Sequence, residues 1–271
     1  MIVKKYWTKN PYALDGKYLS GSAFTGFFLH SVATPQSDAQ VFIAGRDKSN
    51  YTSSGVNGFV DDKAAWLTLP SLETKGKVKR APHAGRPAND HYIGFEMCEP
   101  NQIQYNTNHT KIIGCTDFDA AYAYVKKVYA NAVELFAELC IFHGKDPLEK
   151  GVIYSHKEGH AAGVATNHGD PDQLWSYFDK TLTMDKFRAD VAARMKELAK
   201  GENADDEQEE TEVRYYKLKE VPKYYRPTLD KLIDKKLFFG EGGEGEERIV
   251  NITEDACKVL TINDRAGLYG E

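Results

Sequence analysis

Residues 92–98, YIGFEMC, form a short run rich in aromatic and apolar side chains, which is typical of a buried β-strand. Three further runs have the same character: Gly26–Val32 (GFFLHSV), Gly58–Val60 and Trp66–Leu69. Helical patterns lie between and after these runs. Because strands are interspersed with helices, the sequence predicts an α/β domain with a central mixed β-sheet flanked by helices.

The strongest helical pattern follows residue 116. Thr116 is suited to cap a helix because Asp119 stands three residues later, and apolar residues then recur with a helical period until Gly144. A second helix is predicted from Asp185 to Lys200, and a shorter one over Asp38–Ala44. These helices are the elements expected to cover the sheet.

An acidic run divides the chain. The segment Gly201–Glu212, GENADDEQEETE, carries seven acidic residues and no basic residue. Such a composition is typical of a solvated linker, because like charges repel and there is little apolar surface to bury. The sequence therefore predicts a main domain over 1–200, an acidic linker over 201–212 and a small, mainly helical module over 213–271. Its predicted helices are Pro227–Leu237 and Glu254–Leu260.

Composition argues against several classes of protein. No run approaches the roughly 20 apolar residues of a membrane-spanning helix, and the first sixteen residues lack the apolar segment of a secretory signal. The net charge of −5, without a basic stripe, argues against nucleic-acid binding. The four cysteines lie far apart without CxxC spacing, so neither a disulfide framework nor a zinc knuckle is expected.

Histidines gather in Ser155–Leu174, SHKEGHAAGVATNHGDPDQL. This segment holds His156, His160, His168 and the carboxylate Asp170. His156 and His160 have the spacing of a helical zinc pair, but the glutamate between them is not placed as in the metalloprotease motif. Pairing of His156 with His168 or with Asp170 is a second interpretation, and a polar surface loop without metal is a third.

Two upstream residues could complete a metal-dependent hydrolase, which needs three protein ligands, an open position for water and a base beside that water. His30 ends an apolar strand and is well placed as a first ligand. Glu96 lies within IGFEMC, where Phe95 and Met97 take the opposite face, so Glu96 shares its face with Gly94 and suits the floor of a cleft. Taken alone, each residue is also compatible with an ordinary structural role.

Four segments occur in the order of a known family: FLHSVATP (28–35), HAG (83–85), YIGFEMCEP (92–100) and SHKEGHAAGVATNHGDPDQLW (155–175). Together they resemble the N-acetylmuramoyl-L-alanine amidase 2 family, which includes phage endolysins and peptidoglycan recognition proteins. The resemblance covers roughly residues 20–182. It implies the α/β fold of this family, with a central mixed β-sheet flanked by helices.

The resemblance also implies roles for individual residues. Zinc would be bound by His30, His156 and Asp170, and Glu96 would be the catalytic base. Many relatives carry a lysine two residues before the third ligand, where this chain has His168. His168 would then stabilise the oxyanion, or it would replace Asp170 as the ligand.

The implied reaction is hydrolysis of the amide between the lactyl group of N-acetylmuramic acid and L-alanine in peptidoglycan. Trp66, His83 and Asn89 lie in segments that border the substrate groove in relatives, and His160 is read as rim or substrate contact. For Trp66, plain core packing is an equally good interpretation. Two alternatives remain open: a recognition module without catalysis, and a zinc peptidase acting within the stem peptide.

Retention of Asp170 and Glu96 favours the enzyme, because recognition members of the family typically lack the third ligand. The tail resembles the C-terminal modules of Gram-positive prophage amidases, which implies cell-wall binding or self-association as a homodimer. Neither a nucleic acid nor a membrane is expected as a partner. The expected location is cytoplasmic synthesis with release to the cell wall, as for an endolysin, or secretion if a leader has been removed, as for an autolysin.

Overall fold

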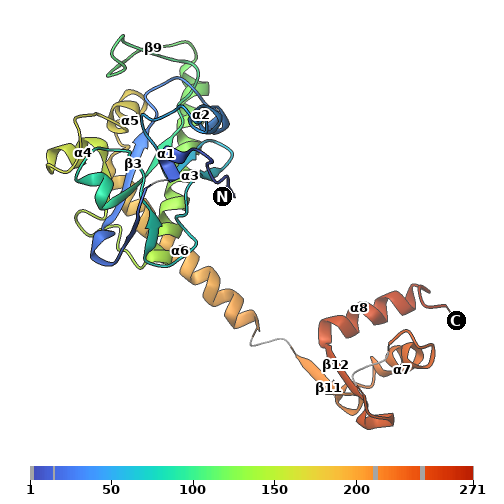
Figure 1. Ribbon diagram of the computed structural model, residues 1–271. Coiled ribbons are helices and arrows are strands. Elements are labelled where there is room, and N and C mark those ends of the chain that lie inside the picture. Colours follow the sequence, from blue (N-terminus) through green and yellow to red (C-terminus); the bar gives the residue numbers. More distant parts are fainter. Residues whose placement is uncertain (1–2, 15, 210–212, 239–241, 271) are drawn as a thin grey trace. The chain divides into compact units, whose positions relative to one another are not determined.

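The computed structural model describes residues 3–14, 16–209, 213–238 and 242–270. It divides into two compact units, residues 1–198 and 199–271 (Figure 1). Each unit has its own hydrophobic core and is described by itself.

The first unit is built on a six-stranded sheet with the strand order β1-β5-β4-β7-β3-β10. Its strands are β1 (Val3–Lys5), β3 (Gly26–Ser31), β4 (Gly58–Val60), β5 (Ala65–Leu67), β7 (Tyr92–Met97) and β10 (Ile153–Ser155). Strands β4 and β5 are antiparallel and the other neighbours are parallel, so the predicted mixed central sheet is confirmed. The edge strands β1 (VKK) and β10 (IYS) were not predicted, because neither is a continuous run of apolar or aromatic residues.

Smaller elements surround this sheet. Two short antiparallel pairs join β2 (Tyr18–Ser20) to β6 (Lys77–Lys79) and β8 (Ile103–Tyr105) to β9 (Ile112–Cys115). The helices of this unit are α1 (Pro11–Leu14), α2 (Ala39–Arg46), α3 (Phe118–His143), α4 (His156–Ala161), α5 (Asp172–Phe178) and the first part of α6 (Met184–Glu209), up to Leu198.

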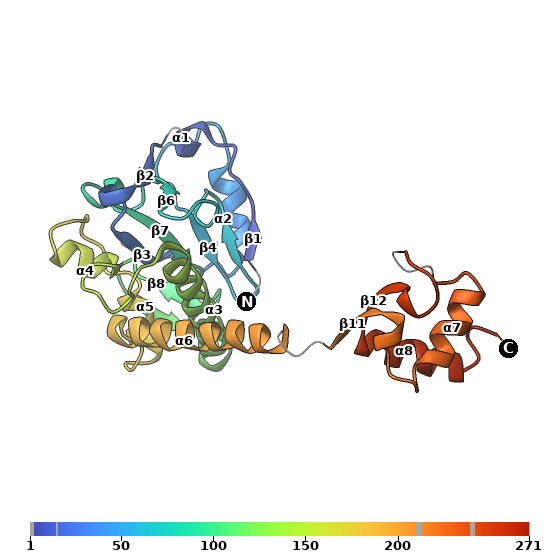
Figure 2. The same cartoon turned by 90° about the horizontal axis from the view of Figure 1, so that it is seen from below.

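One face of the sheet is covered by α3, with α6 packed beside it (Figure 2). The main core lies between the sheet and these helices. It contains Phe27, Leu29, Phe95, Met97, Phe136 and Phe187, all 1% exposed or less. Asp117 caps the start of α3 by accepting the Ala120 N–H at 3.0 Å, so the cap lies one residue after the predicted Thr116. Gly144 ends the helix in the left-handed conformation, with φ of 65°.

The opposite face carries α2 and the site described below. Ile43 of α2 belongs to one apolar cluster with Phe59 of β4, Trp66 of β5 and Cys98, which follows β7. Because side chains alternate along β7, Glu96 emerges on this face while Phe95 and Met97 enter the main core, as the pattern predicted.

Helix α6 continues nine residues beyond its predicted end at Lys200 and enters the acidic run. Glutamate, glutamine and alanine are good helix formers, so this composition is compatible with a helix as well as with an extended linker. Residues 210–212 of the predicted linker lie outside the described residues.

The second unit combines an antiparallel strand pair, β11 (Arg214–Lys217) with β12 (Ile249–Thr253), and the helices α7 (Arg226–Asp234) and α8 (Glu254–Arg265). Its core contains Leu218, Val221, Tyr225, Leu229, Val250, Ile252 and Cys257. Both helices were predicted, whereas the strand pair was not. Among the described residues of the whole chain, no helix is long and apolar enough to cross a membrane.

Candidate metal centre

Three buried side chains meet at the carboxyl ends of two neighbouring strands. His30 is the penultimate residue of β3, and His156 follows β10 as the first residue of α4. Because β3 and β10 are parallel and adjacent, their carboxyl ends lie at the same edge of the sheet. Asp170 comes from the loop before α5, and its carbonyl accepts the His156 N–H at 3.0 Å, which ties that loop to the start of α4.

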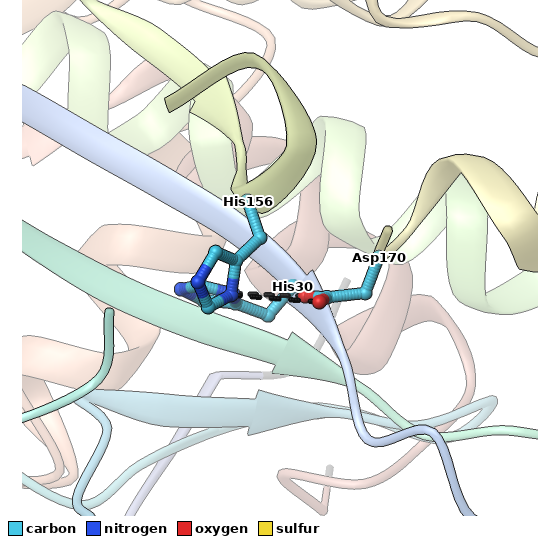
Figure 3. Close-up of side chains that lie close together, drawn as sticks. All are labelled: His30, His156 and Asp170. Atoms are coloured by element: carbon cyan, nitrogen blue, oxygen red, sulfur yellow. Dashed lines mark hydrogen bonds and ion pairs between the residues drawn. The ribbon is translucent and has the colours of Figure 1, made fainter. Parts of the chain in front are cut away.

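The side chains of His30, His156 and Asp170 point toward one another (Figure 3). His30 Nδ1 lies 2.9 Å from Asp170 Oδ2, and His156 Nδ1 lies 3.4 Å from Asp170 Oδ1. One nitrogen or oxygen atom from each of the three residues lies within 4.8 Å of the others, and each residue is 5% exposed or less. This arrangement could hold a single metal ion.

The charges at this group suit a cation. Burial by itself would raise the pKa of Asp170, but hydrogen bonds with His156 and His30 outweigh it and hold that pKa below its ordinary value. Burial lowers the pKa of His156, although the hydrogen bond with Asp170 opposes the change. The surroundings therefore favour the carboxylate form of Asp170, and burial favours the neutral form of the His156 imidazole, which is the form that binds a metal.

Glu96 lies on β7 directly beside His30 of β3 in the register of the two parallel strands. Residues that are aligned on two neighbouring parallel strands lie on the same face of the sheet, so the His30 and Glu96 side chains emerge on the same face. Glu96 Oε1 accepts a hydrogen bond from Arg46 at 3.1 Å, and the Arg46 guanidinium lies over the Phe59 ring. This ion pair orients the Glu96 carboxylate, and the sequence did not predict it.

The other two histidines of Ser155–Leu174 lie outside this three-residue group. The exposed His168 ring stacks on His156, with centroids 4.6 Å apart and planes 10° apart. His160 is exposed, and its Nδ1 lies 3.3 Å from the Ala165 carbonyl oxygen. The structure thus brings His156 together with Asp170, while His168 stacks on His156 and His160 is not part of the three-residue group.

The expected substrate contacts His83 and Asn89 are committed to protein partners. His83 Nδ1 lies 3.0 Å from His30 Nε2, and its Nε2–H donates to the Tyr92 carbonyl at 3.1 Å. Burial, followed by the nearby His30, lowers the pKa of His83 well below its ordinary value. Asn89 Oδ1 accepts the His83 and Ala84 N–H groups at 2.9 and 2.8 Å. Asn89 also lines a surface pocket of about 280 Å³.

Trp66 lies on β5, three strands away from β3 in the sheet order. Its side chain belongs to the cluster under α2, and its indole N–H donates to Asp61 Oδ2 at 3.0 Å. With the residue only 9% exposed, this environment matches the core-packing interpretation of Trp66 better than a substrate contact.

Two residues near the centre were not singled out from the sequence. Glu99 is fully buried and accepts the Ala33 N–H and the Tyr105 O–H, each at 3.1 Å. Burial raises the pKa of Glu99 to about 7. The sequence feature that could have identified Glu99 is its place as the second acidic residue of the apolar run YIGFEMCEP. Thr166 Oγ1 lies 3.0 Å from His156 Nε2. No sequence feature could have identified Thr166, because threonine is ordinary in a polar loop.

Comparison with known proteins identifies the family and the fold of this chain. The chain matches a family model described as N-acetylmuramoyl-L-alanine amidase over residues 20–173. The fold is similar to that of the Staphylococcus aureus hydrolase AmiA, solved in complex with its ligand. The two chains share 16% identity, with 72% of this chain and 83% of AmiA covered and a TM-score of 0.54.

Two further solved structures are similar. A mutant endolysin from Bacillus subtilis and the catalytic domain of XlyA each share 19% identity with this chain. In both comparisons 70% of this chain and 99% of the other are covered, with TM-scores of 0.47 and 0.48 respectively. No match was found among curated proteins.

The fold and the family match together define a hydrolase of the amidase type. The chain belongs to the N-acetylmuramoyl-L-alanine amidase family and is an enzyme of this class, with peptidoglycan as the substrate that the family implies.

Proposed function

We propose that the protein is a zinc-dependent amidase that cleaves the bond between the lactyl group of N-acetylmuramic acid and L-alanine. The observation that carries the proposal is the convergence of His30, His156 and Asp170 within 4.8 Å. Two imidazoles and one carboxylate are a donor set found in catalytic zinc sites, and three protein ligands leave a fourth position for water.

The residues present fit a divalent cation. An ionised carboxylate that is 5% exposed carries a desolvation cost unless opposite charge lies beside it. Asp170 has two imidazole Nδ1 atoms as its close partners, and a cation among the three groups would neutralise the buried charge. His30, His156 and Asp170 are thus the proposed ligands.

Zinc bound there would supply a water molecule of lowered pKa and would polarise the substrate carbonyl. Glu96 lies beside His30 in the strand register and is hydrogen-bonded by Arg46; we assign it the role of accepting a proton from water and returning it to the departing amine of L-alanine. To His168, whose exposed ring stacks on His156, we assign the donation of a hydrogen bond to the developing oxyanion. Asn89, which also lines a surface pocket, and the exposed His160 stay proposed contacts of the substrate.

Digestion of purified peptidoglycan tests the reaction. We expect mass spectrometry to find intact stem peptides with free N-terminal alanine, and we expect a zinc chelator to abolish cleavage until zinc is restored. His91→Ala is a matched control, because His91 is an exposed histidine outside the proposed site. Cleavage within the stem peptide would show a peptidase instead. Binding of peptidoglycan without cleavage by the zinc-loaded protein would show a recognition module.

For the second unit we propose self-association or cell-wall binding, so that the enzyme acts at the cell wall. Large apolar side chains are exposed on α8 and the segment after it: Val259 (55%), Ile262 (64%) and Leu268 (70%). Burying such side chains against a second copy would stabilise a homodimer. Light scattering of the full chain should then give a dimer mass that Ile262→Asp lowers to the monomer mass. If the protein is a monomer at every concentration, self-association is excluded and cell-wall binding is the proposal that stands. Sedimentation of the protein with peptidoglycan tests that proposal.

A further inference from the structure

We propose that the segment His83–Asn89, together with Thr166, sets the tautomer and ring orientation of both histidines of the metal centre. In this arrangement His30 and His156 each present Nδ1 to the metal, and neither His83 nor Thr166 is a ligand. The inference rests on the proposed zinc site and concerns the residues behind it.

The hydrogen bonds behind His30 can run in only one direction. The Tyr92 carbonyl oxygen can only accept, so His83 Nε2, 3.1 Å away, must carry the hydrogen. The neutral His83 ring then has a bare Nδ1, which accepts the His30 Nε2–H at 3.0 Å. With Nε2 carrying a hydrogen, the Nδ1 atom of His30 can present its lone pair to a bound metal, which would replace the hydrogen bond that Nδ1 makes with Asp170 Oδ2 at 2.9 Å.

The hydrogen bonds behind His156 lead to the same result through a different residue. Thr166 Oγ1 lies 3.2 Å from the Ala84 carbonyl oxygen, which takes the single hydroxyl hydrogen. An Oγ1 lone pair is then left for His156 Nε2 at 3.0 Å, so this nitrogen donates. The Nδ1 of His156 can then present its lone pair to a bound metal, which would replace its contact with Asp170 Oδ1 at 3.4 Å.

Both chains of hydrogen bonds involve residues of His83–Asn89. The Ala84 carbonyl also accepts the Thr166 N–H at 2.9 Å, which joins the segment to the loop that carries Thr166. Within the same segment, Asn89 Oδ1 accepts hydrogen bonds from the His83 and Ala84 N–H groups. One short segment therefore supports two ligands that come from different elements, His30 from β3 and His156 from the start of α4.

Two glycines permit this close packing. A β-carbon at Gly94 of β7 would lie 2.6 Å from Cγ of His83, so only glycine lets the ring lie against the strand. A β-carbon at Gly85 would lie 2.7 Å from Cγ2 of Thr166, and Gly85 has φ of +80°, which also favours glycine. The backbone around the segment is thus shaped to hold these two side chains.

The expected consequence is tighter metal binding. Outer hydrogen bonds that fix a histidine ligand typically contribute 10–100-fold in metal affinity or activity. His83→Phe keeps a ring beside Phe28 but removes the acceptor for His30, and Thr166→Val keeps the volume but removes the acceptor for His156. Thr166→Ser retains the hydroxyl and should restore the affinity that Thr166→Val loses.

The test is zinc affinity of the full chain, measured by competition with a chromogenic chelator. We expect His83→Phe and Thr166→Val each to weaken it about 10–100-fold, and Thr166→Ser to remain close to wild type. His143→Phe is the matched control. His143 is buried with both ring nitrogens bonded, to the Gly76 N–H at 3.0 Å and the Ser71 carbonyl at 2.7 Å, but it lies outside the metal centre. Its replacement should lower stability without changing zinc affinity.

The histidine nitrogen resonances of the zinc-loaded protein supply a second readout. They should show zinc at Nδ1 and hydrogen at Nε2 for both His30 and His156, and coordination through either Nε2 would overturn the inference. Wild-type zinc affinity in Thr166→Val would also overturn it, even if His83→Phe fails to fold. If the unaltered protein binds no zinc, the proposed function fails as well, so the two failures are distinguishable.

Discussion

His30 and Asp170 are separated by 140 positions in the sequence, yet His30 Nδ1 lies 2.9 Å from Asp170 Oδ2 in a buried contact. The contact forms because β3 ends where the loop before α5 passes the start of α4, and the Asp170 carbonyl accepts the His156 N–H there. The contact joins the ligand from β3 to the ligand from the loop before α5 in the proposed zinc site. Substitution of Asp170 breaks this contact.

Asp170→Ala should remove most of the bound zinc and abolish amidase activity, because the site loses its one charged ligand. Zinc content by elemental analysis and peptidoglycan digestion check this together. Asp172→Asn serves as the control, since Asp172 lies two residues away and is not part of the three-residue group. Zinc retained in Asp170→Ala, with loss in His168→Ala, would identify His168 as the third ligand.

Glu96→Gln should lower kcat by about 10²–10⁴-fold while zinc content stays at the wild-type value, because the amide cannot accept the proton from water. Gln preserves the size of the side chain and an acceptor for the Arg46 hydrogen bond. Turnover and zinc content measured on the same preparation separate loss of the base from loss of the metal. Unchanged turnover would exclude Glu96 as the base.

His168→Ala should lower kcat by about 10²-fold if His168 donates to the oxyanion, and the zinc content should not change. His168→Lys should recover part of this loss, because the resemblance to the family places a lysine at this position. Recovery by lysine is the discriminating result: a ring needed only to stack on His156 would not be replaced by an ammonium group.

Glu99 predicts a pH dependence of stability. Its pKa is about 7 in the folded protein and 4.5 ordinarily, so between these values the folded state holds a proton that the unfolded state has lost. The Glu99 contribution is therefore most favourable below pH 4.5 and declines as pH rises to about 7, by roughly 3 kcal/mol at most.

Urea unfolding at several pH values, comparing the unaltered protein with Glu99→Gln, isolates this contribution because the variant cannot ionise. The wild type should lose stability relative to Glu99→Gln as pH rises from 4.5 to 7. A difference in the free energy of unfolding that stays constant over this range would contradict the prediction.

Local sequence patterns determined much of the fold. The β-strands β3 and β7 were predictable because buried strands need continuous apolar side chains, and the two-residue alternation put Glu96 on the face opposite Phe95. Helix α3 was predictable because its apolar period matches the helical repeat. The family resemblance named His30, His156 and Asp170 as a ligand set, while the residues alone left several pairings open.

Tertiary structure alone decided how these side chains meet and what stands behind them. His83 and Thr166 contact the two histidines only because a loop from one part of the chain folds onto another, and no local pattern encodes that closure. Burial decided the rest: it packed Trp66 into the core and raised the pKa of Glu99, since desolvation depends on neighbours distant in sequence. Local composition determines the elements, and the chemistry of the site depends on contacts that form only when those elements pack together.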